Sequence, residues 1–239
     1  MTKTISAGIS DVQSRFISID ALRGFAIMLM MVYHVSFDLN YYGWLHQDFN
    51  HATFWLSARA FIVSLFLVLT GISLVLNAQR TGSISYWRRQ AKLLAACIAV
   101  SLGSYLIFPQ SFIFFGILHF ILLASFLGRL CVRFYYANLL AALLCLGISY
   151  SSPVFNAPLL QWLGFMTYKP YTEDYVPLFP WFGVVLLGIF LGRLIIAHPG
   201  WLSRDYKVQP LALAGRYSLA IYLLHQPVLL GVLSLVTFF

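Results

Sequence analysis

The sequence predicts an all-α, polytopic membrane protein with about seven transmembrane helices. Hydrophobic residues make up 61% of the 239-residue chain and charged residues only 9%, with a mean hydropathy of +0.83. Soluble domains, by contrast, are roughly a quarter charged. The net charge of +8 comes from basic residues between the apolar stretches. That distribution is typical of membrane topology, so we expect lipid contacts and no nucleic-acid partner.

Seven stretches are apolar enough to cross a bilayer, which takes about 20 residues. They lie at 16–37, 53–77, 91–108, 111–127, 136–150, 178–197 and 216–237. The first follows a polar segment at 1–15 and has no small-residue cleavage site, so we interpret it as a retained signal-anchor. Pro109 allows a tight hairpin between the third and fourth stretches, because proline cannot continue a helix. We expect a single domain over 1–239.

The distribution of basic residues predicts the orientation. Of the 15 lysine and arginine residues, only Arg59 and Lys169 fall on one side of the predicted membrane. By the positive-inside rule, the N-terminus with its polar segment is cytoplasmic and the C-terminus is external.

The first span carries four ionisable residues in an otherwise apolar helix: Asp20, Arg23, His34 and Asp38. At 100° per residue they share a stripe about 60° wide. Arg23 and His34 are about 16 Å apart in rise, so the stripe places a cation near the inner face and an imidazole near the outer face. Ionisable groups inside a membrane usually mark functional sites. The structural alternative is anchoring at the helix ends, with Asp20 paired to Arg23 and Asp38 outside the helix.

Later spans carry further candidates for contact with a polar acceptor: Arg59, His119, Trp181 and His225. Arg59, near the outer end of the second span, could extend outward or pair with Asp38 or Asp48. The two histidines are predicted near mid-depth, where the structural alternative is a hydrogen bond to a neighbouring helix. Trp181 follows a proline suited to the first turn of a helix, whose N-terminus is weakly positive.

Five segments resemble, in their order along the chain, the small bacterial members of the heparan-alpha-glucosaminide N-acetyltransferase catalytic-domain family. They are SIDALRGFAIMLMMVYHVSFDL, YWRRQAKLL, FIFFGILHF, PLFPWFGVVLLGIFLGR and GRYSLAIYLLHQPVLL. The resemblance, which extends from Arg15 to about Leu230, implies a multi-pass acyltransferase of a bacterial cytoplasmic membrane. In such a protein an acyl group, usually acetyl from cytosolic acetyl-CoA, reaches a sugar amine or hydroxyl on the far side.

The catalytic histidine has two candidates. The Arg-x10-His spacing of Arg23 and His34 resembles the first helix of the membrane O-acyltransferases that modify O-antigen and peptidoglycan. This favours His34, with Asp38 one turn away to hold its ring. The lysosomal member that names the family has asparagine at the position of His34, and its proposed active histidine lies in the following non-cytosolic loop. The nearest match in that loop is His46.

Acyl transfer from a thioester needs a base for the attacking group and a donor that stabilises the oxyanion. Histidine suits the first role because it titrates near neutral pH, and as a nucleophile it would form an acetyl-histidine. The sequence leaves both mechanisms open and predicts no metal site. Arginine is the natural partner for the phosphates of coenzyme A. Candidates at the predicted cytoplasmic face are Arg23, Arg88, Arg89, Arg193 and Arg216, and Arg23 is favoured because it continues the His34 stripe.

Two other functions compete with acyl transfer. His119 and His225, predicted at similar depth, could ligate a haem between helices. A polar stripe could also line the path of a small transporter, although transporters often have internal repeats and none is evident here. The sequence leaves open the acceptor, the acyl chain length and whether the protein acts alone or as a homodimer.

Overall fold

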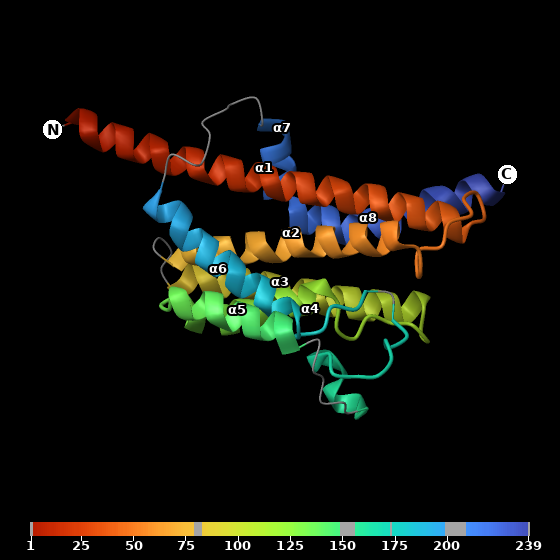
Figure 1. Ribbon diagram of the computed structural model, residues 1–239. Helices are drawn as coiled ribbons and strands as arrows, with labels where there is room; N and C mark the ends of the chain where they lie inside the picture. Colours follow the sequence, from red (N-terminus) through yellow and green to blue (C-terminus); the bar gives the residue numbers. More distant parts are fainter. Residues whose placement is uncertain (1, 79–82, 149–155, 173, 199–208, 239) are drawn as a thin grey trace. The chain divides into compact units, whose positions relative to one another are not determined.

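The computed structural model describes residues 2–78, 83–148, 156–172, 174–198 and 209–238 (Figure 1). Within these ranges it contains eight α-helices, one 3-10 helix and no strand, which confirms the all-α prediction. The elements are α1 (Thr2–Tyr41), α2 (Thr53–Ala78), α3 (Ser83–Ile107), α4 (Ile117–Cys131), α5 (Tyr136–Ile148), η1 (Pro158–Leu163), α6 (Trp181–Ala197), α7 (Gln209–Arg216) and α8 (Ser218–Phe238).

Each of the seven predicted spans coincides with an apolar helix. Four helices are long and apolar enough to cross a bilayer: Ile17–Tyr41 within α1, Thr53–Ala78, Ile84–Ile107 and Ser218–Val236 within α8. The other three, α4, α5 and α6, have 15, 13 and 17 residues. At about 1.5 Å per residue they are shorter than the roughly 30 Å of a hydrocarbon core. The protein is therefore a membrane protein with four candidate spans in the described part of the chain, and seven crossings stay a prediction.

The helix bounds differ from the predicted spans at several places. The first helix continues to Tyr41, so Asp38 lies inside it and the interpretation that placed this residue beyond the helix is wrong. The third begins at Ser83, because the basic residues that precede its apolar part are helical too. The last predicted span is divided at Tyr217 into α7 and α8.

The fourth helix begins at Ile117 rather than near residue 111, because two side chains bind the main chain at its start. The Ile117 N–H donates to Asp174 Oδ2 (3.0 Å) and the Gly116 N–H donates to His119 Nδ1 (3.3 Å). A Cβ at Gly116 would lie 2.5 Å from Asp174 Oδ2. The glycine is therefore needed for the carboxylate to approach and cap the helix.

The described contacts divide the chain into two compact units, and the first consists of residues 1–66 and 198–239. Its apolar core comprises Ile27, Met30 and Ile62, against which α7 and α8 pack through Ala214, Ile221 and Tyr222. The main chains of α1 and α7 meet at two glycines. A Cβ at Gly24 would lie 1.9 Å from the Leu211 carbonyl oxygen, and one at Gly215 would lie 1.7 Å from that of Asp20.

The second unit comprises residues 67–197. Within it, α2 and α6 approach closely through small residues. A Cβ at Gly71 would lie 2.2 Å from the Val185 carbonyl oxygen, and one at Gly188 would lie 2.4 Å from that of Val68. Small residues at helix crossings are common in membranes, and Gly71 and Gly188 have that role here. α5 packs beside α6 in the same unit.

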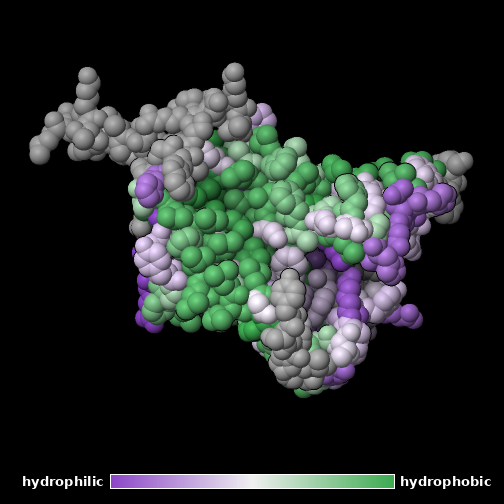
Figure 2. All heavy atoms as spheres, viewed as in Figure 1, coloured by the Kyte–Doolittle hydropathy of each residue, from purple (hydrophilic) through white to green (hydrophobic). Residues whose placement is uncertain are grey.

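Much of the surface in the view of Figure 2 is apolar. Large hydrophobic side chains are exposed along α1, α3, α5 and α8, for example Val32, Leu102, Leu140 and Val232. Contiguous exposed apolar surface of this extent is rare on soluble proteins. It is expected of helices that face lipid.

We expect the linker between α4 and α5 to be cytoplasmic and the loop around Lys169 to be external. The reason is the positive-inside rule. Arg129 lies in the last turn of α4 and Arg133 lies in the linker that follows it. A reporter enzyme active only outside the cytoplasm, fused after Arg133 and separately after Lys169, should give activity only in the second fusion. Activity in both fusions, or in neither, would contradict the orientation.

Candidate functional site

Two histidines meet where α1 and α8 pack together. His34 and His225 have ring centroids 4.9 Å apart and planes inclined by 63°. His225 is 8% exposed and His34 is partly buried. The His34 ring makes ring contacts with Tyr33 and His225 and has no hydrogen-bond partner in the part of the chain that the structure describes. Its nitrogens are therefore available to a substrate.

The tautomer of neutral His225 follows from its main-chain contact. Nδ1 lies 2.6 Å from the carbonyl oxygen of Tyr222. A carbonyl only accepts, so Nδ1 carries the proton and Nε2 carries the lone pair. A ring held in this way is oriented to take a proton at Nε2, as a general base does.

Asp38 is also on this face of α1, but it does not orient His34. It is 2% exposed, and its two carboxylate oxygens accept hydrogen bonds from Gln226 Nε2 at 2.9 and 3.1 Å. The contact expected between Asp38 and the His34 ring is thus replaced by the contact between Asp38 on α1 and Gln226 on α8. The cause is tertiary, because Gln226 follows His225 directly and α8 brings both to the polar stripe of α1.

The loop between α1 and α2 is held by Phe49, which is 3% exposed. Its ring stacks on Trp55 at 4.1 Å and meets Tyr33 and Phe37 edge-on at 5.6 and 5.3 Å. His46, the alternative catalytic residue, is exposed on this loop. The loop therefore has a fixed anchor, but that anchor does not enclose His46.

His51, in the same loop, is also exposed and contacts Asp48. Its Nδ1 lies 3.0 Å from Asp48 Oδ2. The main-chain N–H groups of His51 and Asn50 donate to Oδ1 of the same carboxylate. These contacts, chiefly the main-chain N–H of His51, lower the pKa of Asp48. The Asp48 carboxylate therefore stabilises the turn before α2.

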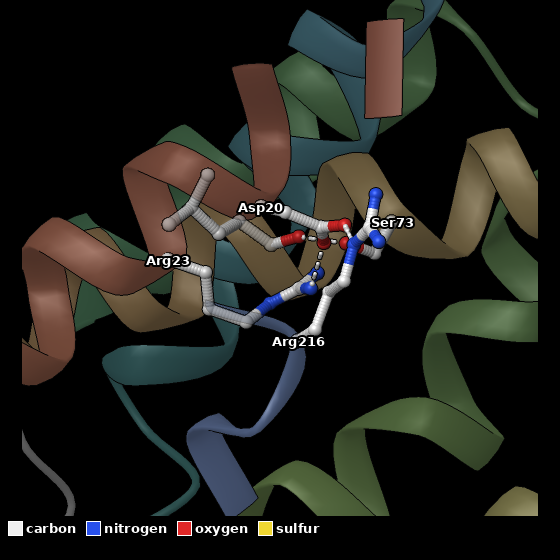
Figure 3. Close-up of polar contacts among 5 residues, drawn as sticks. Asp20, Arg23, Ser73 and Arg216 are labelled. Carbon is white, nitrogen blue, oxygen red and sulfur yellow. Dashed lines mark hydrogen bonds and ion pairs between the residues drawn. The ribbon is translucent and has the colours of Figure 1, made fainter. Parts of the chain in front are cut away.

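At the other end of the α1 stripe, Asp20 joins two arginines (Figure 3). Arg23 Nη1 lies 2.8 Å from Asp20 Oδ1 and Arg216 Nε lies 3.4 Å from Oδ2. The Arg23 side chain is 23% exposed and that of Arg216 is 59% exposed. The close α1–α7 crossing at Gly24 and Gly215 brings Arg216 to this position. With two cations and one carboxylate, the cluster has a net charge of +1 and is suited to an anion.

The other predicted arginines have different surroundings. Arg88 and Arg89 are exposed near the start of α3. Arg193 instead binds the end of α4, where its Nε and Nη2 donate to the Val132 carbonyl oxygen at 3.2 and 2.6 Å. Arg59 lies near Tyr33. Among the described residues of the first unit, Arg23 and Arg216 therefore lie together at Asp20.

His119 is part of a hydrogen-bonded network in the second unit. Nδ1 accepts from the Gly116 N–H, so Nε2 carries the proton and donates to Ser101 Oγ (3.1 Å), while Ser101 donates to the Ile113 carbonyl (2.7 Å). The direction of this chain gives Ser101 no base, and both nitrogens of His119 are engaged. That arrangement argues against His119 as a haem ligand.

Trp181 is the first residue of α6.

The region that encloses both polar clusters matches a known family. The heparan-alpha-glucosaminide N-acetyltransferase catalytic family matches residues 15–227. The chain belongs to this family. The match begins just before Asp20 and ends just after Gln226, so every residue of the His34–His225 and Asp20–Arg23–Arg216 clusters lies within it. No curated protein and no solved structure matches the chain.

Membership of this family supports the expectation of a membrane acetyltransferase. Sequence reasoning identified all four residues of the α1 stripe and both histidines, but it missed Gln226 and the pairing of His34 with His225. The available signal was the polar pair His225–Gln226 next to Pro227 in an apolar helix. Like the stripe on α1, that pair consists of polar residues within an otherwise apolar helix.

Proposed function

We propose that this protein is a membrane acyltransferase that moves an acetyl group from cytosolic acetyl-CoA to an amine or hydroxyl of a sugar outside the cytoplasm of a bacterium. The observation that carries the proposal is the His34–His225 pair, held between α1 and α8 in a chain of an acetyltransferase family. A small transporter is a weaker candidate, because the family that the chain belongs to is one of acetyltransferases.

In the proposed reaction, His225 Nε2 takes a proton from the ammonium or hydroxyl group of the sugar. The freed lone pair attacks the thioester carbonyl carbon, the C–S bond breaks, and the coenzyme A thiolate leaves and takes up a proton. His34, adjacent to His225, donates a hydrogen bond to the developing oxyanion. Such a donor lowers the barrier because it is already oriented when the charge forms.

The Asp20–Arg23–Arg216 cluster is the proposed contact for the phosphates of coenzyme A. Arginine matches phosphate with two parallel hydrogen bonds, and Asp20 holds both guanidinium groups in one place. Arg23 and His34 are on the same stripe of α1, about 16 Å apart along the helix. The extended pantetheine arm of coenzyme A has a length suited to that separation.

The decisive experiment is transfer of labelled acetyl from acetyl-CoA to glucosamine by the purified protein in lipid vesicles. Glucosamine offers both an amine and hydroxyl groups, so it serves as a probe for either acceptor chemistry. We expect labelled acetylglucosamine that accumulates with time and protein concentration. Labelled coenzyme A derivatives alone, with no labelled sugar for glucosamine or a panel of extracytoplasmic glycans, would overturn the proposal.

We expect Arg23→Ala to weaken acetyl-CoA binding at least about tenfold. A charge-assisted hydrogen bond contributes roughly 1.5–3 kcal/mol, which corresponds to that factor or more. Isothermal titration calorimetry of the purified protein measures the change.

Arg133→Ala is the matched control for this substitution, because Arg133 is exposed and its guanidinium lies over the Phe134 ring, 4.7 Å from the ring centre. It should leave affinity within about twofold, since the charge of an exposed arginine that no carboxylate holds in place is screened by salt. Equal affinity in Arg23→Ala and wild type would remove Arg23 from the donor site.

A further inference from the structure

The amide of Gln226 has an orientation set by charge. Its Nε2 donates to both oxygens of Asp38. An ionised carboxylate accepts hydrogen bonds and cannot donate them. The NH2 group of Gln226 must therefore face Asp38, and Oε1 must face away from it.

Oε1 of Gln226 is buried and accepts no hydrogen bond from the residues that the structure describes. A buried acceptor without a donor is costly, and the large majority of buried polar atoms in proteins have a partner. Oε1 therefore retains an unused capacity to accept a hydrogen bond, which a donor from outside the chain can satisfy.

Other acceptors lie beside it on α8. His225, the preceding residue, presents the lone pair of Nε2 because Nδ1 is bound to Tyr222. Pro227, the following residue, has no N–H, so the Leu223 carbonyl lacks its usual helical donor. This turn of α8 is thus rich in acceptors, and a ligand with several O–H or N–H groups complements it.

We propose that Gln226 Oε1 accepts a hydrogen bond from a hydroxyl or amino group of the sugar acceptor and holds that sugar beside the His34–His225 pair. Asp38 is then a positioning residue, which acts on the sugar by holding the Gln226 amide in one orientation. The assignment rests on the proposed function for the identity of the ligand. It gives Asp38 a role different from orienting His34.

The test compares Asp38→Asn with the double variant Asp38→Asn/Gln226→Met. Replacing Gln226 alone would leave the buried Asp38 carboxylate without the amide that donates to it. Both variants therefore carry asparagine at 38, and they differ only in the side chain at 226. Methionine keeps the length of glutamine but has no amide oxygen. Ser234→Ala, on the same helix and exposed, is the control. The midpoint of thermal unfolding is measured for each protein to confirm that it is folded.

Expected values follow from the geometry. An asparagine at 38 can donate or accept, so the Gln226 amide occupies two orientations and the KM for glucosamine rises about twofold. Loss of the oxygen in the double variant raises KM about fivefold further. The kcat of both variants should stay within about twofold of wild type, because the contact is made equally in ground and transition states. Ser234→Ala should match wild type in both constants.

Binding of glucosamine without acetyl-CoA, followed by saturation-transfer NMR, separates this assignment from the proposed function. Suppose that wild type binds glucosamine most tightly, Asp38→Asn less tightly and the double variant least, but that wild type transfers no acetyl group to any sugar. The proposed function is then overturned and the Gln226 assignment stands. If wild type transfers acetyl and the double variant has the KM and affinity of the single variant, the Gln226 assignment is overturned. A fall in kcat of about a hundredfold in Asp38→Asn, or no glucosamine binding by wild type, would overturn it too.

Discussion

Replacing either His34 or His225 with alanine is expected to lower the rate of acetyl transfer by about 10²–10⁴-fold, the usual loss for a positioned proton-transfer group. His225→Ala removes the base itself. His34→Ala removes the ring beside it, whose centroid is 4.9 Å away. The measurement is transfer of labelled acetyl from acetyl-CoA to glucosamine at saturating concentrations of both substrates, with each variant at equal amount in lipid vesicles.

His46→Ala and His51→Ala are the matched controls, since both remove an imidazole from an exposed loop position. They should retain a measurable fraction of activity, because a loop contact to the acceptor affects KM more than kcat. Full activity in His34→Ala together with none in His46→Ala would overturn the assignment. It would also make the loop histidine the catalytic residue, as proposed for the lysosomal member of the family.

Gly24→Ala is expected to destabilise the protein more than any other single methyl addition on α1, by about 3 kcal/mol. The added Cβ would lie 1.9 Å from the Leu211 carbonyl oxygen and 2.8 Å from its carbon. Both atoms belong to the main chain of α7 and cannot rotate away, so the helices must separate. The midpoint of thermal unfolding should fall by several degrees, and acetyl-CoA affinity should fall with it, because Arg216 is held against Asp20 by this crossing.

Gly231→Ala gives the control for that substitution. Gly231 is on α8 and a Cβ there meets no atom within 4 Å. Alanine also has a better helix propensity than glycine by roughly 1 kcal/mol, so this variant should be as stable as wild type or slightly more so. If the two glycine variants unfold at the same temperature, the close α1–α7 crossing is contradicted.

The fold class was predictable because it depends on composition and on the length of apolar stretches. In a membrane every main-chain polar group must be satisfied within the chain, so an apolar stretch of this length is helical. The start of α4 was less predictable. It depends on a carboxylate 57 positions further along the chain. The residues around the start of α4 do not indicate that contact.

The candidate site was predictable in part for a similar reason. The stripe of Asp20, Arg23, His34 and Asp38 is visible in the sequence, since helical periodicity alone puts these residues on one face. Their partners were not visible. His34 was expected to use Asp38, its neighbour at i+4, whereas Asp38 binds Gln226 and His34 meets His225.

The sequence by itself determined that this is a helical membrane protein of an acetyltransferase family, with a polar stripe on its first apolar helix. The fold class follows from composition and the length of the apolar stretches, the family from five segments in order along the chain, and the stripe from spacing along one helix. Only the tertiary structure decided what the stripe faces. Gly24 and Gly215 let the main chains of α1 and α7 touch, and that approach brings Arg216 to Asp20. Packing of α8 on α1 brings His225 to His34 and Gln226 to Asp38. These contacts join residues about 190 positions apart, and backbone packing rather than local periodicity selects them.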